Sequence, residues 1–306
     1  MSQFTHLVSD KAYATMPVKL RMDVMGANIV FLRKIIAVLG VGLLLGSPVV
    51  RAALQPISYH DVGSGVPLVL IHAFPTDKKL WEAQEAELKN HFRVISLDLL
   101  GFGEAEKVSG QAITMRDYAD EVKKLLDQLH IQNAIIGGES MGGYVTLAFL
   151  AQYPHYIQGV ILADTQAIDD SAEAKAKREA TAQDVLSHGP TNFIQGFMSK
   201  ALSPHATPET KQFLQTIAEA QSANAIASAL RGMALRQDLS HVLADSSLPV
   251  LIITGEQDTL ISPQQSQAMH ALAKNSKLVI IENADHLANL EQPVAWNKAV
   301  IGMFSR

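Results

Sequence analysis

One serine stands among closely spaced glycines in the segment 137–143, whose sequence is GGESMGG. The serine is Ser140, and Gly138 and Gly142 lie two residues before and after it. An apolar run precedes the segment and an Ala- and Leu-rich stretch follows it, so a strand is expected to turn sharply into a helix here. Glycine tolerates the close backbone approach that such a turn requires. The turn would expose the Ser140 hydroxyl as a nucleophile.

A serine hydroxyl needs a base to accept its proton before it becomes a good nucleophile. His286 is the candidate base, because it directly follows the last predicted strand, and Asp258 follows the strand before it. Asp258 could therefore orient the imidazole at the same edge of the sheet as Ser140. Asp164, which closes an earlier strand, is a competing acid. We prefer Asp258 because it lies in the longer loop ahead of the His286 turn.

Each of these residues also has a simpler explanation. Asp258 could cap the helix that begins near Pro263, Asp285 could be the acidic partner of another group, and His286 could be an ordinary loop histidine. The chain contains 11 histidines, so most of them must be structural. Three candidates at three strand ends nevertheless favour a joint catalytic role over three separate structural ones.

Attack on a carbonyl also requires N–H donors for the oxyanion that forms. The backbone amide of Phe74 is one candidate, because the loop 72–75 (HAFP) follows the first buried strand. The amide of Met141 is the second, since this residue opens the helix after Ser140 and a helix N-terminus favours negative charge. His72 is expected to hold this loop in place.

The elements that position these residues alternate between short apolar runs and longer helical stretches. Strands that alternate with helices predict an α/β fold with a mostly parallel central sheet and helices on both faces. The predicted strands are 57–61 (an edge strand), 67–72, 92–97, 133–137, 159–163, 250–254 and 278–281, and the predicted helices are 81–88, 115–129, 141–152, 263–273 and 293–304.

The segment from about residue 165 to 239 breaks this alternation, because it contains helical sequence and no convincing strand. We interpret it as a helical cap inserted over the carboxyl edge of the sheet; ordinary peripheral helices are the alternative. Side chains that could line a pocket below it, or belong to the core, are Phe193, Phe197, Met198 and Met233. Arginines that could hold an acidic substrate, or be solvated, are Arg178, Arg231 and Arg236.

Composition limits the function classes. A chain of 306 residues with 48% hydrophobic residues can bury a sizeable core. The net charge of -5 argues against a nucleic-acid partner. The chain has no cysteine, which excludes disulfides, thiolate zinc sites and a cysteine nucleophile.

The N-terminal region has the pattern of a secretory signal peptide. Arg33 and Lys34 precede the eleven apolar residues 35–45, and small residues follow up to Ala52. At roughly 1.5 Å per residue, a helix of that length cannot cross a hydrocarbon core of about 30 Å. We therefore predict an N-terminal extension over 1–53, a main domain over 54–306, and export to the periplasm or medium. A membrane anchor extended back to residue 29, a buried helix in a cytoplasmic protein, and a start at Met22 or Met25 are alternatives.

From residue 55 to 306 the sequence resembles the α/β-hydrolase superfamily, and within it the bacterial group of 3-oxoadipate enol-lactonases, small carboxylesterases and cofactor-free haloperoxidases. The matching motifs are HAFP (72–75), DLLGFG (98–103), GESMGG (138–143), GEQD (255–258), DHL (285–287) and EQP (291–293). The resemblance implies an α/β-hydrolase fold with a helical cap and a reaction without cofactor or metal. It also implies a catalytic triad of Ser140, Asp258 and His286, with oxyanion donors at Phe74 and Met141.

The chain departs from the family pattern in two places. Ala73 stands where the family usually has glycine, and Leu100 and Glu104 replace the usual residues after Asp98. Neither change affects a triad residue, so they bear on substrate class rather than on reaction type.

The sequence therefore predicts a serine hydrolase that cleaves a small carboxylic ester or lactone through an acyl-enzyme. The same triad could instead support perhydrolysis, thioester hydrolysis or C–C bond hydrolysis. A non-catalytic ligand binder on the same scaffold and a membrane-tethered structural protein are rivals of other classes. The expected partner is a small molecule, with no stable membrane span after signal cleavage.

Overall fold

The computed structural model describes residues 57–305, all of which belong to one compact unit. The predicted signal peptide and the predicted boundary at residues 53 and 54 lie outside the described residues and stay predictions. Among residues 57–305, no helix is both long enough and apolar enough to cross a bilayer.

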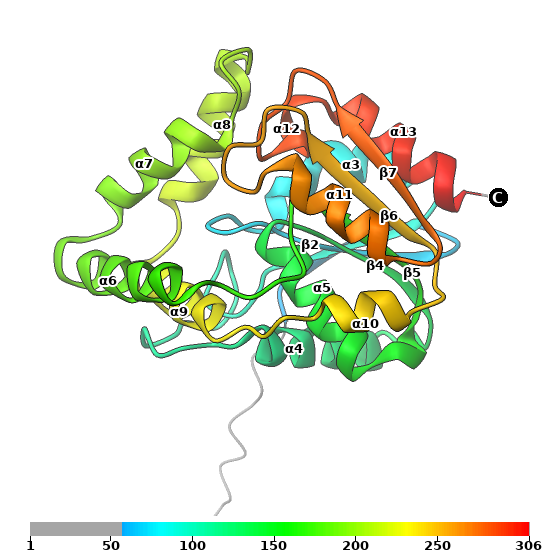
Figure 1. The fold of residues 1–306 in the computed structure, drawn as a ribbon, viewed down its shortest axis with the longest axis horizontal. Helices are drawn as coiled ribbons and strands as arrows, with labels where there is room; N and C mark the ends of the chain where they lie inside the picture. Colours follow the sequence, from blue (N-terminus) through cyan, green and yellow to red (C-terminus); the bar gives the residue numbers. More distant parts are fainter. Residues whose placement is uncertain (1–56, 306) are drawn as a thin grey trace, which may run out of the picture. The chain divides into compact units, whose positions relative to one another are not determined.

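The centre of the fold is a seven-stranded sheet with the order β1-β3-β2-β4-β5-β6-β7 (Figure 1). β1 pairs antiparallel with β3, and each of the other neighbouring pairs is parallel. The mostly parallel sheet confirms the predicted fold class, with the first predicted strand at the sheet edge. The strands are β1 (Tyr59–Gly63), β2 (Pro67–Ile71), β3 (Arg93–Leu97), β4 (Ala134–Glu139), β5 (Ile157–Ala163), β6 (Val250–Gly255) and β7 (Ser276–Ile281).

Helices cover both faces of the sheet, which explains why the inner strands are largely apolar on both faces. In β2, Val69 and Ile71 belong to one core cluster, whereas Leu68 and Leu70 belong to the other. The first cluster is shared with α4 (Met115–Gln128), α5 (Met141–Gln152) and α11 (Pro263–Leu272), and the second with α3 (Glu82–Leu88) and α13 (Pro293–Phe304). Shorter elements are the 3₁₀ turns η1 (Lys78–Trp81) and η2 (Pro154–Tyr156) and the helices α10 (Ser240–Asp245) and α12 (Ala288–Glu291).

Four helices and no strand occupy the chain between β5 and α10, as the missing strand pattern predicted. They are α6 (Ala172–His188), α7 (Thr191–Ala201), α8 (Pro208–Glu219) and α9 (Ala223–Ala234), called the helical insertion below. α6 and α9 pack against each other, and α7 lies beside α8 (Figure 1). Ile226 of α9 joins the first core cluster and Leu214 of α8 joins the second, so the insertion shares the core of the sheet domain.

Candidate active site

Ser140 occupies a tight turn between β4 and α5. Its φ is 53° and its ψ is -111°, a conformation that non-glycine residues rarely adopt. A Cβ on Gly142 would stand 2.1 Å from the carbonyl oxygen of Ile71, on the neighbouring strand β2. Close packing therefore requires a glycine at position 142, which confirms the predicted sharp turn from strand to helix. Ser140 itself is only 8% exposed, so the turn does not leave it open to solvent as expected, because neighbouring elements cover it.

Two backbone contacts hold Ser140 in this conformation. Its N–H donates to the carbonyl oxygen of Ala163 at 2.8 Å, and its own carbonyl oxygen accepts a hydrogen bond from the Thr165 hydroxyl at 2.8 Å. Thr165 also packs where a Cβ on Gly143 would lie. This supporting role was not predicted, and the position of Thr165 just after β5 was its only signal in the sequence.

The three predicted triad side chains lie in one hydrogen-bonded row. His286 Nε2 is 2.8 Å from the Ser140 Oγ, and His286 Nδ1 is 3.0 Å from the Asp258 Oδ2. The other carboxylate oxygen of Asp258 accepts the N–H groups of Leu260 and Ile261, each at 2.9 Å. All three side chains are buried. Asp258 is thus fixed by backbone donors on one oxygen while the other faces the imidazole.

Charge around His286 favours its protonated form. Burial alone would lower the pKa of the imidazole, but the Asp258 carboxylate outweighs this effect, with further contributions from Asp164 and Asp285. The pKa of His286 is therefore raised above its usual value of 6.5. An imidazole in this setting can take a proton from Ser140 and hold it as the imidazolium ion.

The other candidate acids have different partners. Asp164 Oδ1 accepts the N–H of Gly255 at 2.7 Å, and Asp285 Oδ1 accepts the N–H of Thr259 at 3.0 Å. Within residues 57–305, Asp258 is the one candidate acid that is hydrogen-bonded to the imidazole of His286. The sequence-based preference for Asp258 over Asp164 therefore agrees with the geometry.

The two candidate oxyanion donors flank the serine. Met141 is the first residue of α5, so its N–H has no partner within the helix. The N–H of Phe74 makes no backbone hydrogen bond to any described residue. Neither amide has a hydrogen-bond acceptor among the described residues, so both stay candidate oxyanion donors.

His72 holds the loop that carries Phe74. Its Nδ1–H donates to the carbonyl oxygen of Ala73 at 2.8 Å, and its Nε2 accepts the N–H of Leu99 at 3.1 Å. Burial lowers the pKa of His72, so the ring is neutral, as these two contacts require. The Ala73 methyl, where the family has glycine, is fully buried in the second core cluster. His72 thus has the structural role that the sequence predicted.

One residue of the helical insertion reaches this loop. The ring of Phe193 in α7 packs against the ring of Phe74 with 5.5 Å between centroids, and Phe102 packs on Phe74 at 6.2 Å. Met233 is buried in the first core cluster, Phe197 packs against the second, and Met198 packs against both. Met198 also lines a cavity of about 740 Å³ together with Gln257, Thr259 and Asp285, which are the sequence neighbours of Asp258 and His286. Phe193 and Met198 are therefore the two of these four candidates that lie beside an expected site loop.

The three candidate arginines are paired with protein carboxylates. Arg178 and Arg236 both contact Asp170, at 2.5 Å and 2.8 Å, and Arg231 contacts Glu179 at 2.7 Å. Arg236 is buried and stacks on the Tyr144 ring at 4.3 Å, so the expectation that it is solvated is wrong. These charges are already compensated inside the protein.

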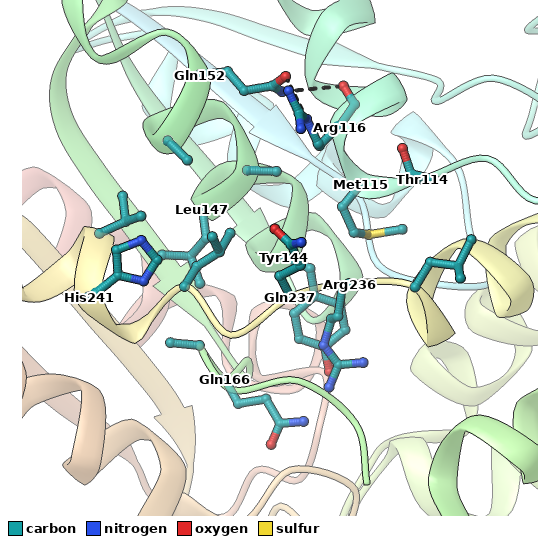
Figure 2. Close-up of a pocket in the computed structure, with 16 residues that line it drawn as sticks. Thr114, Met115, Arg116, Tyr144, Leu147, Gln152, Gln166, Arg236, Gln237 and His241 are labelled. Carbon is teal, nitrogen blue, oxygen red and sulfur yellow. Dashed lines mark hydrogen bonds between the residues drawn. The ribbon is translucent and has the colours of Figure 1, made fainter. Parts of the chain in front are cut away.

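A cavity of about 420 Å³ lies beside α5, one helical turn beyond Ser140. Figure 2 shows Tyr144, Leu147, Gln166 and Arg236 among its lining residues. None of the predicted triad or oxyanion residues lines this cavity. It is therefore separate from the row of Ser140, His286 and Asp258.

Glu291 was not predicted as part of the site, although its motif was noted. Its Oε1 accepts the N–H of Asp285 at 2.7 Å, which fixes the turn that carries His286. Its Oε2 accepts the N–H of Ser203 at 3.0 Å and the Ser203 hydroxyl at 2.5 Å. Because Ser203 follows α7, the Glu291 carboxylate connects the helical insertion to the turn that carries His286.

Comparison with known proteins identifies one family. Residues 66–293 match the family described as alpha/beta hydrolase fold. A Bacillus subtilis relative, AB hydrolase superfamily protein YisY, is 31% identical over 80% of this chain and 93% of its own. The 3-oxoadipate enol-lactonase 2 of Acinetobacter baylyi is 29% identical over 78% of this chain and 88% of its own.

Solved structures give the same picture. A thermophilic esterase from Thermogutta terrifontis, solved with malate bound, is 34% identical with a TM-score of 0.78 and covers 80% of this chain and 91% of its own. The enol-lactonase from Burkholderia xenovorans LB400, at 24% identity, has a TM-score of 0.74 over 81% of this chain and 95% of its own, and this likeness concerns the fold alone.

Proposed function

The chain belongs to the α/β-hydrolase fold family and is a hydrolase, and on this basis we propose that it cleaves a small carboxylic ester or lactone by serine catalysis. The observation that carries the proposal is the position of His286. One imidazole nitrogen contacts the Ser140 hydroxyl and the other contacts the Asp258 carboxylate. A non-catalytic binder would have no need of this buried row.

The Asp258 contact defines which nitrogen of His286 is the base. A carboxylate only accepts hydrogen bonds, so Nδ1 carries a hydrogen and donates it to Asp258. In the neutral ring Nε2 is then the free acceptor, and it lies at hydrogen-bonding distance from Ser140 Oγ. Asp258 thereby selects the reactive tautomer and stabilises the imidazolium that forms.

The reaction proceeds through an acyl-enzyme. His286 Nε2 takes the Ser140 proton while Oγ forms a bond to the substrate carbonyl carbon, and the amides of Phe74 and Met141 bind the resulting oxyanion. The imidazolium returns its proton to the leaving alkoxide as the C–O bond breaks. Water then attacks the acyl group with its proton passing to His286, and Ser140 leaves protonated as the acid is released.

Two observations support a small substrate. The Ser140 side chain is only 8% exposed, and Phe193 of the insertion packs directly on the oxyanion loop at Phe74. Relatives whose names state a substrate include a 3-oxoadipate enol-lactonase, and a structural relative at 34% identity is an esterase. A lactone and a small ester present the same carbonyl to the serine.

Active-site labelling tests the proposal. A fluorophosphonate should label the wild type and the Ser64→Ala variant but not Ser140→Ala, because Ser64 is an exposed serine at the opposite edge of the sheet. p-Nitrophenyl esters of increasing chain length and a γ-lactone are then assayed with all three proteins. Absence of Ser140-dependent labelling would overturn the enzyme proposal in favour of a ligand binder. Labelling without turnover of any ester or lactone, but with thioester turnover, would overturn the substrate class.

A further inference from the structure

Three carboxylic side chains are buried at the carboxyl ends of three adjacent strands. Glu139 is the last residue of β4, Asp164 follows β5, and Asp258 follows β6. Glu139 and Asp164 are 0% exposed and Asp258 is 4% exposed. The proposed mechanism uses only Asp258, so two buried acids next to the nucleophile have no assigned role.

The remaining oxygens of these two acids have no donor. Asp164 Oδ1 accepts the Gly255 N–H, but Asp164 Oδ2 and both carboxyl oxygens of Glu139 are buried without a hydrogen-bond partner among the described residues. Glu139 is opposite Ala163 in the register of β4 and β5, so the two carboxyl groups lie at adjacent positions of neighbouring strands. The indole N–H of Trp296 from α13 is likewise buried without a hydrogen-bond partner among the described residues. Buried polar atoms are rarely left unpaired in this way.

A proton between the two groups resolves this arrangement. Two ionised carboxylates cannot hydrogen-bond to each other, and in a dry site they repel strongly. Once one of them is protonated, its O–H can donate to the other, and two of the three unpaired oxygens, one on each carboxyl group, then have a partner. The pair then carries a single negative charge instead of two.

We infer that Glu139 and Asp164 share one proton and act as positioning residues for His286. The pair then carries one negative charge next to the row of Ser140, His286 and Asp258. This inference rests on the proposed function, because it concerns the base of that reaction. With the pair singly charged, the imidazole faces that charge, the Asp258 carboxylate and Asp285. Loss of the shared proton would add one more negative charge at the same edge of the sheet.

The pKa values of both groups are raised, so the pair retains at least one proton at neutral pH. Burial, opposed by contacts with Asp164 and Trp296, raises the pKa of Glu139 to about 8. Burial and the nearby Glu139 raise the pKa of Asp164 well above its usual range. The groups that face this pair are Asp258 from the loop after β6, His286 from the loop after β7, and the neutral Trp296 from α13.

The inference is tested by removing the two carboxyl groups one after the other and measuring the pH dependence of kcat/KM for each variant. In Glu139→Gln, Asp164 ionises against the new amide donor, so the pair keeps one negative charge. The midpoint of the acid limb, which is the fall of kcat/KM at low pH, should stay within about 0.2 pH units of wild type. The wild type should also show a change in kcat/KM near pH 8, where the pair loses its proton, and this change should be absent from the variant. The double variant Glu139→Gln/Asp164→Asn has no charge, and its acid limb should move down by roughly half a pH unit or more.

Other charge states give different results. If both acids are ionised in the wild type, Glu139→Gln alone will lower the acid limb, and the inference is wrong. If the pair is only a structural link between β4 and β5, the variants will lose stability without moving either limb. The matched control is Glu121→Gln, which removes a half-buried carboxyl on α4 with a pKa raised to about 7 by burial. Its acid limb should equal that of wild type.

Two spectroscopic measurements remain informative if a variant folds poorly or if the enzyme proposal fails. Infrared spectra of the wild type and Glu121→Gln at pH 7 should both contain the C=O band of a protonated, hydrogen-bonded carboxyl. The double variant Glu121→Gln/Glu139→Gln should lack that band, and its persistence there would overturn the inference. Glu121 is removed in this comparison because its carboxyl, with a pKa raised to about 7, would itself contribute to the band at pH 7. NMR titration of ¹⁵N-histidine protein reports the pKa of His286 without turnover, whereas a failure of Ser140 labelling would count against the proposed function alone.

Discussion

The backbone of Gly138 lies so close to that of Gly142 that a Cβ built on Gly138 would stand 2.1 Å from the Gly142 carbonyl oxygen. Real side chains do not approach this closely, so any residue larger than glycine must push β4 away from the start of α5. The two ends of the serine turn are thus in direct backbone contact.

Gly138→Ala is therefore expected to destabilise the fold by about 1–3 kcal/mol, because overpacking a rigid site forces backbone shifts. Labelling of Ser140 should fall with it, since the turn can no longer present the hydroxyl. Chemical denaturation and fluorophosphonate labelling measure the two effects. Gly196→Ala is the control, because Gly196 lies in α7 with open space around it, where alanine should gain up to about 1 kcal/mol. A Gly138→Ala variant as stable and reactive as wild type would contradict the packing argument.

Asp258→Asn should reduce kcat by about 10³–10⁴-fold, because an amide at this position favours the wrong tautomer of His286. Asp164→Asn should lose less than about tenfold at its own pH optimum, since Asp164 is hydrogen-bonded to Gly255 rather than to the imidazole. Steady-state kinetics on one ester substrate compare the two variants directly. A larger loss for Asp164→Asn would show that the acid has been assigned to the wrong residue.

The pH dependence of kcat/KM should follow the His286 base. Activity requires the neutral imidazole, so the rate falls as the pH drops through the pKa of this group. Because Asp258 raises that pKa, the midpoint of the acid limb should lie above 6.5. In Asp258→Asn the main raising charge is gone while burial remains, so the midpoint should move below the wild-type value. If the midpoint of the acid limb is the same in both proteins, the acid limb does not report the ionisation of His286.

Glu291→Gln should lower both stability and kcat, because the amide cannot accept hydrogen bonds from Asp285 and Ser203 as strongly as the carboxylate does. A loss of about 1–3 kcal/mol is expected for hydrogen bonds to a charged group. A double-mutant cycle with Ser203→Ala should show coupling between the two positions. Glu282→Gln, an exposed neighbour after β7, should behave like wild type in both measurements.

Export of the protein predicts a defined mature N-terminus. Cleavage after the apolar run 35–45 should give a first residue between about 46 and 54, because the small residues read by a signal peptidase lie there. N-terminal sequencing of the exported protein identifies this residue. A mature start well before residue 46, or an intact N-terminus in the cytoplasm, would refute the signal peptide.

The order of strands and helices was predictable because the inner strands are short, largely apolar runs buried on both faces. The serine turn was predictable for a similar reason, since Gly138, Ser140 and Gly142 are close in sequence and their chemistry is local. Strand β1 was displaced by two residues, because an edge strand has weaker burial and the turn glycine Gly63 is part of it.

Contacts between distant segments were not predictable from patterns. Glu139 and Asp164 are 25 residues apart and meet only because β4 and β5 are neighbours in the sheet. Asp170 and Arg236 are separated by the whole helical insertion, so the sequence alone left Arg236 free to be solvated. In each case the two residues are not separated by a helical or strand repeat, so only the tertiary fold brings them into contact.

The bridge made by Glu291 has an evolutionary consequence. A loop such as the one after α7 would ordinarily drift freely, because surface connections tolerate substitutions, insertions and deletions. Here Ser203 is tied to the turn that carries His286 through a single carboxylate. The carbonyl oxygen of Ala201 also accepts the N–H of Leu287, so the end of α7 has a second contact with the same turn. Lineages that reshape the insertion to accept new molecules must therefore preserve these two contacts or compensate for their loss, so changes of specificity are expected earlier in α6 and α7 before they reach Ala201 and Ser203.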